Sequence, residues 1–162
     1  MPSVSPVAAI PSVTSAMLSA PASSNAHRTM PGSRWAFELA GADSIAMVTD
    51  GMAATGLTDG TYTLGAAEVR VQDGVASLVS NGSIAGGTAT MLEVLRRTVA
   101  AGVPLGDALR SATVVPARVL GLAGEAGSLT AGALADLLVV GEDLRLEAVM
   151  RRGEWISGTP PR

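Results

Sequence analysis

The spacing of the apolar residues changes twice along this chain, and this change restricts the folds that it can adopt. Apolar and polar residues alternate between Thr61 and Val79, as they do in half-buried strands. Apolar residues recur at helical spacing from Thr88 to Leu120, and strand-like runs return between Leu137 and Ile156. No internal repeat accompanies these changes. The sequence therefore predicts a mixed α/β fold that is not built from repeats.

Four segments carry the signals of helices. The clearest covers residues 88–101, where the apolar residues share one helical face. Either Thr88 or Thr90 can cap the start of this helix, and Gly102 ends it. Three shorter helices are predicted at residues 35–40 before Gly41, at residues 104–111 beginning with Pro104, and at residues 115–120 before Gly121.

Short apolar runs bounded by turn residues predict the strands. Residues 44–49 form such a run before Asp50-Gly51, which predicts a buried strand that delivers Asp50 at its C-terminal end. A carboxylate in that position is typical of α/β active sites. Asp73-Gly74 separates two alternating runs and predicts a β-hairpin. The other predicted strands cover residues 61–64, 67–71, 75–79, 137–140, 146–151 and 155–156.

Residues 1–33 are rich in Pro, Ser and Ala and follow neither period, which predicts a disordered or linker-like lead-in. Prolines interrupt the apolar runs of this segment and no early Lys or Arg precedes them, so it does not resemble a secretory signal. No run of about 18 apolar residues occurs in the sequence, which argues against a membrane span. We therefore expect a cytoplasmic protein without a membrane partner.

Charge and residue content exclude several kinds of site. The formal net charge is −3, and the basic side chains are arginines scattered along the chain apart from two adjacent pairs. Nucleic acid is therefore not expected as a partner. The absence of cysteine excludes disulfides, thiolate metal sites and cysteine nucleophiles. The one histidine, His27, cannot by itself supply a zinc site that needs two or three histidines.

Residues 47–56 read M-V-T-D-G-M-A-A-T-G. They resemble the segment V-T-D-A-M-A-A-x-G at the end of the last barrel strand in the N-acetylglucosamine-6-phosphate deacetylase branch of the amidohydrolase superfamily, with Gly51 where Ala is usual. The resemblance implies that Asp50 is a metal ligand and the catalytic general base and acid. Such a carboxylate takes a proton from a metal-bound water and returns it to the leaving amine. The alternative is that Asp50 only caps a turn, because Asp before Gly is common at strand ends.

Residues 83–91 read S-I-A-G-G-T-A-T-M. They resemble the family's loop A-G-S-x-L-T-M, which lies against the substrate, with Gly87 in place of Ser. The resemblance implies substrate-binding roles for Gly86, Gly87, Thr88 and Met91. The alternative is a glycine-rich start of a helix with an N-cap. The strands within residues 61–79, inserted between Asp50 and this loop, point to the deacetylase branch of the superfamily.

Two further segments indicate the superfamily rather than the substrate. Residues 111–122 resemble A-T-x-x-P-A-R-x-L-G-L, in which Pro116 begins a helix, so a structural role is expected. Residues 127–140 resemble G-x-L-x-x-G-x-x-A-D-L-x-V, from the small β domain that flanks the barrel. We expect Asp136 in this segment to make structural hydrogen bonds.

His27 and Arg28 resemble part of the family's H-H-R-E-P-G, whose arginine meets the substrate phosphate across a dimer interface. The resemblance implies that these two residues bind the phosphate and that the protein is a homodimer. Their separation from Asp50 is much shorter than in the family, so the alternative is a histidine in a linker.

The family fold is a metal-dependent (β/α)8 TIM barrel with a small β-sandwich domain made from both chain ends, and a barrel needs about 200 residues or more. The resemblance implies that this chain of 162 residues is the C-terminal part of that fold. Residues 34–122 are expected to be the last part of the barrel with an inserted β-hairpin. Residues 123–162 are expected to be the C-terminal strands of the β-sandwich domain.

The resemblance also implies an activity. The substrate is an amino-sugar phosphate, N-acetylglucosamine-6-phosphate, whose acetamide is hydrolysed to glucosamine-6-phosphate and acetate. The cofactor is a divalent metal, Zn or Fe, and most of its ligands are absent from this chain. We therefore expect the chain to be incomplete and inactive alone. The alternative is a non-catalytic, amidohydrolase-derived fragment or interaction module.

Overall fold

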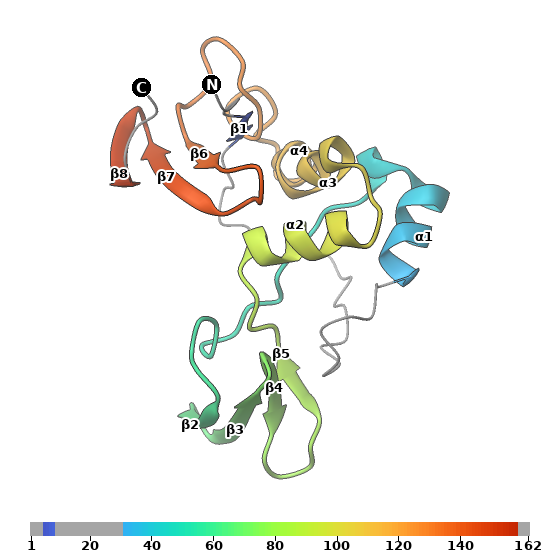
Figure 1. The fold of residues 1–162 in the computed structure, drawn as a ribbon, viewed down its shortest axis with the longest axis vertical. Helices are drawn as coiled ribbons and strands as arrows, with labels where there is room; N and C mark the ends of the chain where they lie inside the picture. The colour runs from blue at the N-terminus through green and yellow to red at the C-terminus, as the bar shows by residue number, and fades with distance from the viewer. Residues whose placement is uncertain (1–4, 9–30, 159–162) are drawn as a thin grey trace.

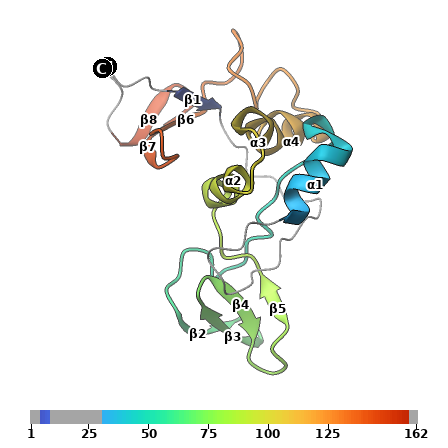
Figure 2. The same cartoon turned by 45° about the vertical axis from the view of Figure 1, so that its right-hand side comes forward.

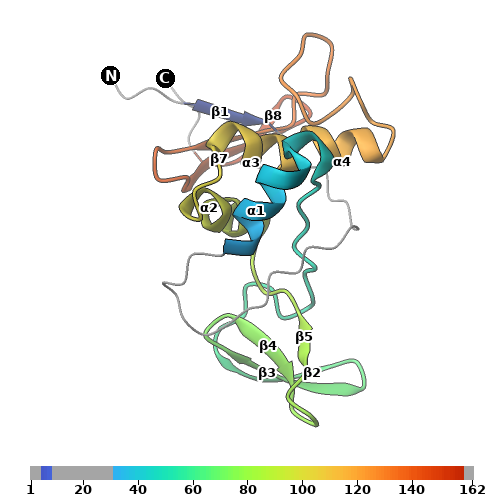
Figure 3. The same cartoon turned by 90° about the vertical axis from the view of Figure 1, so that its right-hand side faces the viewer.

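The computed structural model describes residues 5–8 and 31–158, which form two four-stranded antiparallel sheets and a group of helices (Figure 1). The helices lie on one side of the first sheet (Figures 1 and 3). The second sheet extends away from them along the long axis (Figure 1). Two segments, residues 45–59 and 87–90, join the second sheet to the helices (Figure 2). The fold confirms the predicted mixed α/β class.

The first sheet joins the two ends of the described chain. It contains β1 (Ser5–Ala8), β6 (Leu137–Val140), β7 (Leu146–Arg151) and β8 (Glu154–Gly158) in the order β1-β6-β7-β8. The three strands predicted near the C-terminus are therefore confirmed, with β8 longer than expected.

The strand β1 corrects, for residues 5–8, the prediction of a disordered or linker-like lead-in over residues 1–33, of which residues 1–4 and 9–30 lie outside the described residues. β1 pairs with β6, so that Ser5 faces Val140 and Pro6 faces Val139. Proline is tolerated here because β1 is an edge strand, where an N–H can be missing without breaking the ladder. A strand of four residues carries little period of its own, and its partner lies near the other end of the sequence.

The second sheet contains β2 (Gly60–Leu64), β3 (Ala67–Gln72), β4 (Val75–Leu78) and β5 (Ile84–Gly86) in sequence order. The alternation of apolar and polar residues that predicted β3 matches the burial along the strand, where Val69 and Val71 are buried and the residues next to them are exposed. Asp73 and Gly74 form the predicted turn with φ of 51° and 72°, a conformation that Asp and Gly tolerate. The strand β5 was not predicted, because its glycine-rich segment was assigned to a loop.

The predicted helices are all present. They are α1 (Pro31–Ala40), α2 (Met91–Ala100), α3 (Leu105–Ala112) and α4 (Val114–Val119), with a short 3₁₀ helix η1 (Ala42–Ser44) after α1. The helix α1 begins four residues earlier than expected and ends, as predicted, before Gly41, whose φ is 75°. Of the two candidate caps for α2, Thr90 is the one used.

The helices pack around a core of small and medium-sized side chains. Its buried members are Met47, Leu95, Val103, Ala108 and Ala112. The two alanines lie on one face of α3, four residues apart, so α2 and α3 can approach closely. This packing suits a chain in which only 2% of residues are aromatic.

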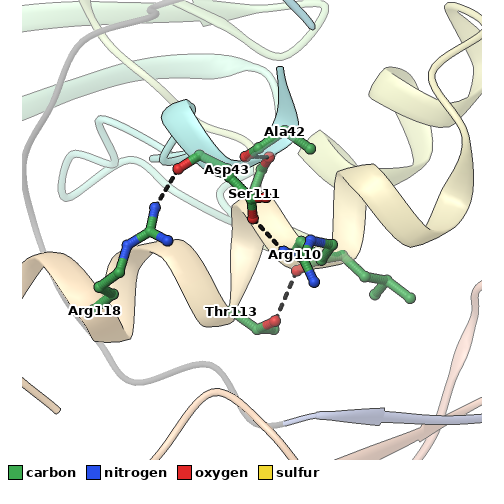
Figure 4. A network of polar contacts seen from close by, with 7 residues as sticks. Ala42, Asp43, Arg110, Ser111, Thr113 and Arg118 are labelled. Carbon is green, nitrogen blue, oxygen red and sulfur yellow. Dashed lines mark hydrogen bonds and ion pairs between the residues drawn. The ribbon is translucent and has the colours of Figure 1, made fainter. Parts of the chain in front are cut away.

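Polar contacts fasten η1 to α3 and α4 (Figure 4). The Arg110 guanidinium donates to the Asp43 carboxylate, and the Arg118 guanidinium donates to the Asp43 backbone carbonyl. The fully buried Ser111 donates its hydroxyl to the Ala42 carbonyl at 3.1 Å. Arg118 belongs to the segment 111–122, so a structural role for that segment is confirmed, although α4 begins at Val114 rather than at Pro116.

Asp136 also has the structural role that the sequence predicted. Its carboxylate accepts a hydrogen bond of 2.6 Å from the backbone N–H of Arg152 in the β7–β8 turn. The backbone N–H of Gly153 in the same turn donates to the Ala135 carbonyl at 2.9 Å. Ala135 and Asp136 of the segment 127–140 therefore hold the β7–β8 turn of the first sheet.

A capping box at the start of α2 gives a pH-dependent prediction. The Thr90 N–H donates to the Glu93 carboxylate at 2.7 Å, and the Glu93 N–H donates to the Thr90 hydroxyl at 3.4 Å. The hydrogen bond from the Thr90 backbone lowers the pKa of Glu93 below its ordinary value. A lowered folded-state pKa stabilises the fold above the ordinary glutamate pKa, and this stability is lost as the pH falls through the lowered value.

We expect Glu93→Gln to lower the free energy of unfolding at pH 7, because it removes a carboxylate that stabilises the helix N-terminus. The loss should be only about 0.5 kcal/mol, because solvent screens this carboxylate. The difference from the parent protein should shrink when the pH falls below the ordinary glutamate pKa. Urea unfolding of both proteins at pH 7 and at pH 3 measures it. A difference that stays constant or grows toward low pH would contradict the assignment.

Candidate active site

Asp50 lies in the first segment that leads to the second sheet. Ile45 and Met47 in this segment are buried, and the Met47 N–H donates to the Ser111 carbonyl at 2.8 Å. The side chain of Asp50 is exposed, and its φ of 47° places it in the left-handed region. Asp tolerates this region better than most residues, and such conformations cluster at functional sites.

The predicted buried strand at residues 44–49 is not formed. Ser44 ends η1, and residues 45–50 belong to no strand. A strand requires hydrogen-bonded neighbours, and the first ladder contact after this segment is the single parallel bridge between Gly51 and Gly87. The prediction of burial is nevertheless confirmed for Ile45 and Met47.

The bridge brings together the two segments in which site residues were predicted. The Gly87 N–H donates to the Asp50 carbonyl at 2.7 Å, and the Met52 N–H donates to the Gly87 carbonyl at 3.0 Å. A Cβ atom on Gly87 would overlap the Thr49 carbonyl, and one on Gly86 would lie 3.3 Å from the Asp50 carbonyl. The two glycines therefore allow the loop before α2 to lie directly against the backbone of Asp50.

Thr88 and Met91 make other contacts. The Thr88 hydroxyl donates to the Gly74 carbonyl and so joins the β3–β4 turn to the segment before α2. Met91 is half-buried and packs against the helical core. The substrate-binding roles predicted for Gly86, Gly87, Thr88 and Met91 remain predictions. Among the contacts above, Gly87 is hydrogen-bonded to Asp50, and Gly86 leaves little room for a side chain beside the Asp50 carbonyl.

His27 and Arg28, predicted to meet the substrate phosphate, lie outside the described residues. A divalent metal was also predicted, with Asp50 among its ligands. Within residues 5–8 and 31–158, no group of three or more His, Asp or Glu side chains lies close enough together to hold a metal ion. The described residues therefore do not fit a metal site by themselves, because one carboxylate is too few ligands.

Sequence reasoning missed Thr55. Its hydroxyl donates to the Met52 carbonyl at 2.8 Å and lies 3.3 Å from the Gly87 carbonyl, so it touches both segments of the site. Thr55 occupies the unspecified position of V-T-D-A-M-A-A-x-G, which is why the resemblance gave it no role. The only signal in the sequence was a hydroxyl side chain within a turn of small residues.

No helix within the described ranges is long and apolar enough to cross a bilayer. Comparison with known proteins identifies the family of this chain. The amidohydrolase family matches residues 14–156 of this chain.

Two relatives by sequence show the extent of the match. The chain is 35% identical to an N-acetylglucosamine-6-phosphate deacetylase of Vibrio furnissii over 119 residues, which are 72% of this chain and 30% of that protein. It is 34% identical to an N-acetylgalactosamine-6-phosphate deacetylase of Escherichia coli O157:H7 over 116 residues, which are 71% of this chain and 30% of that protein.

A solved structure from Mycobacterium smegmatis aligns with a TM-score of 0.71 and 46% identity, over 77% of this chain and 34% of that chain. It is an aspartate-to-alanine variant of an N-acetyl-D-glucosamine-6-phosphate deacetylase in complex with N-acetyl-D-glucosamine-6-phosphate. The chain thus spans about a third of the length of these relatives, as expected for a part of the family fold. This chain belongs to the amidohydrolase family.

Proposed function

We propose that this chain contributes the proton-transferring aspartate of an amino-sugar 6-phosphate deacetylase, and that Asp50 is this aspartate. The observation that carries the proposal is the placement of Asp50, exposed and in the left-handed region, with its carbonyl held by the N–H of Gly87. The resemblance of residues 47–56 to the family segment and the names of the relatives support the same role.

The proposed reaction is the hydrolysis of the acetamide of N-acetylglucosamine-6-phosphate. The Asp50 carboxylate takes a proton from the attacking water as the water oxygen bonds to the carbonyl carbon of the acetamide. The protonated Asp50 then returns the proton to the amine nitrogen as the C–N bond breaks. The products are acetate and glucosamine-6-phosphate. We propose the glucosamine rather than the galactosamine epimer as the substrate, because the 46% identical relative is in complex with N-acetyl-D-glucosamine-6-phosphate.

The rest of the active site is proposed to come from parts of the family fold other than the described residues. We propose that residues 34–122 correspond to the last part of the barrel, with the second sheet as an insertion, and residues 123–162 to strands of the flanking β domain. Metal binding by Asp50, phosphate binding by Arg28 and a homodimer belong to the same proposal. The alternative function, a non-catalytic interaction module, predicts no acetate release in any assembled form.

Two proteins test this function. The chain alone should release no acetate from N-acetylglucosamine-6-phosphate above the buffer rate with Zn²⁺ or Fe²⁺ present, because Asp50 alone cannot hold a metal. A chimera in which residues 34–162 follow the N-terminal part of the Mycobacterium smegmatis deacetylase should release acetate and free amine in equal amounts.

The outcomes separate the alternatives. Metal-dependent acetate release by the chain alone would contradict the expectation that this chain lacks enough ligands to hold a metal. A folded, metal-loaded chimera without turnover would favour the non-catalytic module. A chimera that hydrolyses only the galactosamine epimer would keep the reaction and correct the sugar.

A further inference from the structure

The hydroxyl of Thr55 lies between two backbone carbonyls that belong to different segments. Its oxygen is 2.8 Å from the Met52 carbonyl oxygen and 3.3 Å from the Gly87 carbonyl oxygen. A threonine hydroxyl has one hydrogen, so the two carbonyls share it, and the shorter contact is the stronger hydrogen bond. Removal of the hydroxyl would leave each carbonyl with a backbone donor, the Thr55 N–H at 2.9 Å for Met52 and the Met52 N–H at 3.0 Å for Gly87, but would remove the side-chain contact that joins the two segments.

Both carbonyls accept hydrogen bonds in the turn that follows Asp50, where the Met52 carbonyl also accepts from the Thr55 N–H at 2.9 Å. The Gly87 carbonyl also accepts from the Met52 N–H, and the Gly87 N–H donates to the Asp50 carbonyl. Asp50 itself is a single residue in the left-handed region before Gly51, so its direction depends on how the turn after it is held. Thr55 is the side chain that joins that turn to the facing glycine segment.

The residue after Asp50 makes room for this arrangement. A Cβ atom on Gly51 would lie 3.1 Å from the Thr49 hydroxyl oxygen and 3.3 Å from the Thr55 hydroxyl oxygen, both tighter than ordinary van der Waals contact. The Thr49 hydroxyl in turn accepts from the Gly51 N–H at 3.2 Å. Glycine at position 51 and threonine at position 55 therefore fit each other.

We propose that Thr55 is a positioning residue: its hydroxyl ties the turn after Asp50 to Gly87 and so fixes the direction in which Asp50 presents its carboxylate. The inference rests on the proposed function, because it assigns Thr55 to the proton transfer by Asp50. Thr55 does not take part in the reaction itself. Its contribution is the geometry of the aspartate, to which proton transfer is sensitive.

The first test measures whether the hydroxyl joins the two segments in the 162-residue chain. Thr55→Val keeps the shape of the side chain and removes the hydroxyl, whereas Thr55→Ser keeps the hydroxyl. The amides of Met52 and Gly87 should exchange with D₂O about fivefold or more faster in Thr55→Val than in the parent or in Thr55→Ser. Thr63→Val, exposed on the opposite edge strand β2, is the matched control and should leave both amides unchanged.

The second test measures positioning in the chimera described above. Thr55→Val should lower kcat about tenfold and leave KM within about twofold, because substrate binding does not depend on the direction of Asp50. Thr55→Ser should restore kcat. A merely structural role would instead lower the amount of folded enzyme and leave the kcat of each folded molecule unchanged.

Each outcome decides a separate point. Unprotected Met52 and Gly87 amides in the parent, or equal exchange in Thr55→Val, would overturn the tie between the segments. Faster exchange with an unchanged kcat would overturn the positioning role. An inactive parent chimera counts against the proposed function and withdraws the positioning role with it, while the exchange rates still decide whether the hydroxyl joins the two segments.

Discussion

Asp50→Asn in the chimera should lower kcat for N-acetylglucosamine-6-phosphate by at least about a hundredfold, and substrate binding should survive better than turnover. Asparagine has nearly the size and shape of aspartate but cannot take a proton from water or return one to the leaving amine. Since the proton is transferred in the transition state and not in substrate binding, its loss lowers kcat and kcat/KM together rather than raising KM. Steady-state release of acetate and free amine measures both constants.

The fold should tolerate this substitution. Asp50 has a φ of 47°, and asparagine and aspartate are the non-glycine residues that accept such values most readily. If Asp50 were only a turn cap, asparagine would replace it at little cost, because asparagine caps nearly as well as aspartate. Stability would be kept under both interpretations, and kinetics alone would distinguish them.

The chain contains a closely matched control. Asp73, like Asp50, is exposed, precedes a glycine and has a positive φ, which is 51°. It lies in the β3–β4 turn and has no proposed part in proton transfer. Asp73→Asn should therefore leave kcat within about twofold of the parent. If Asp50→Asn left the rate within about threefold of the parent, the catalytic role of Asp50 would have to be withdrawn.

The elements that could be predicted from the sequence are those whose signals are local. The Thr90 cap, the Gly102 stop and the apolar face between them define α2 within a dozen residues. The Asp73-Gly74 turn sets the register of β3 and β4, because its positive φ values match the twist of the paired strands. Each of these features is complete without contacts from distant parts of the chain.

The features that could not be predicted depend on distant contacts. β1 exists through its pairing with β6, and the hydrogen bond from Gly87 to Asp50 joins residues that lie on either side of the second sheet in the sequence. Met91 belongs both to the helical period of α2 and to the segment that resembles the family's substrate loop, and the fold shows that its side chain packs against the helical core. Thr55 was missed for the same reason, because its partner Gly87 is 32 residues away.

Gly87→Ala should destabilise the fold although it adds a single methyl group. The new Cβ would overlap the Thr49 carbonyl and lie 3.1 Å from the Asp50 carbonyl oxygen. Both are backbone atoms in a hydrogen-bonded segment, so they cannot move aside as the end of a flexible side chain can. We expect a loss of about 1–3 kcal/mol, the usual cost of forcing an extra group into a packed region.

The loss should appear as a melting temperature about 3–10 °C lower, measured by circular dichroism on the 162-residue chain. Gly106→Ala is the control, because Gly106 lies in α3 with no heavy atom within 4 Å of the position of a new Cβ. Alanine favours a helix over glycine, so this variant should be as stable as the parent or slightly more stable. If Gly87→Ala had the same melting temperature as the parent, the two segments could not approach as closely as described. The placement of Asp50, which depends on this approach, would then be wrong.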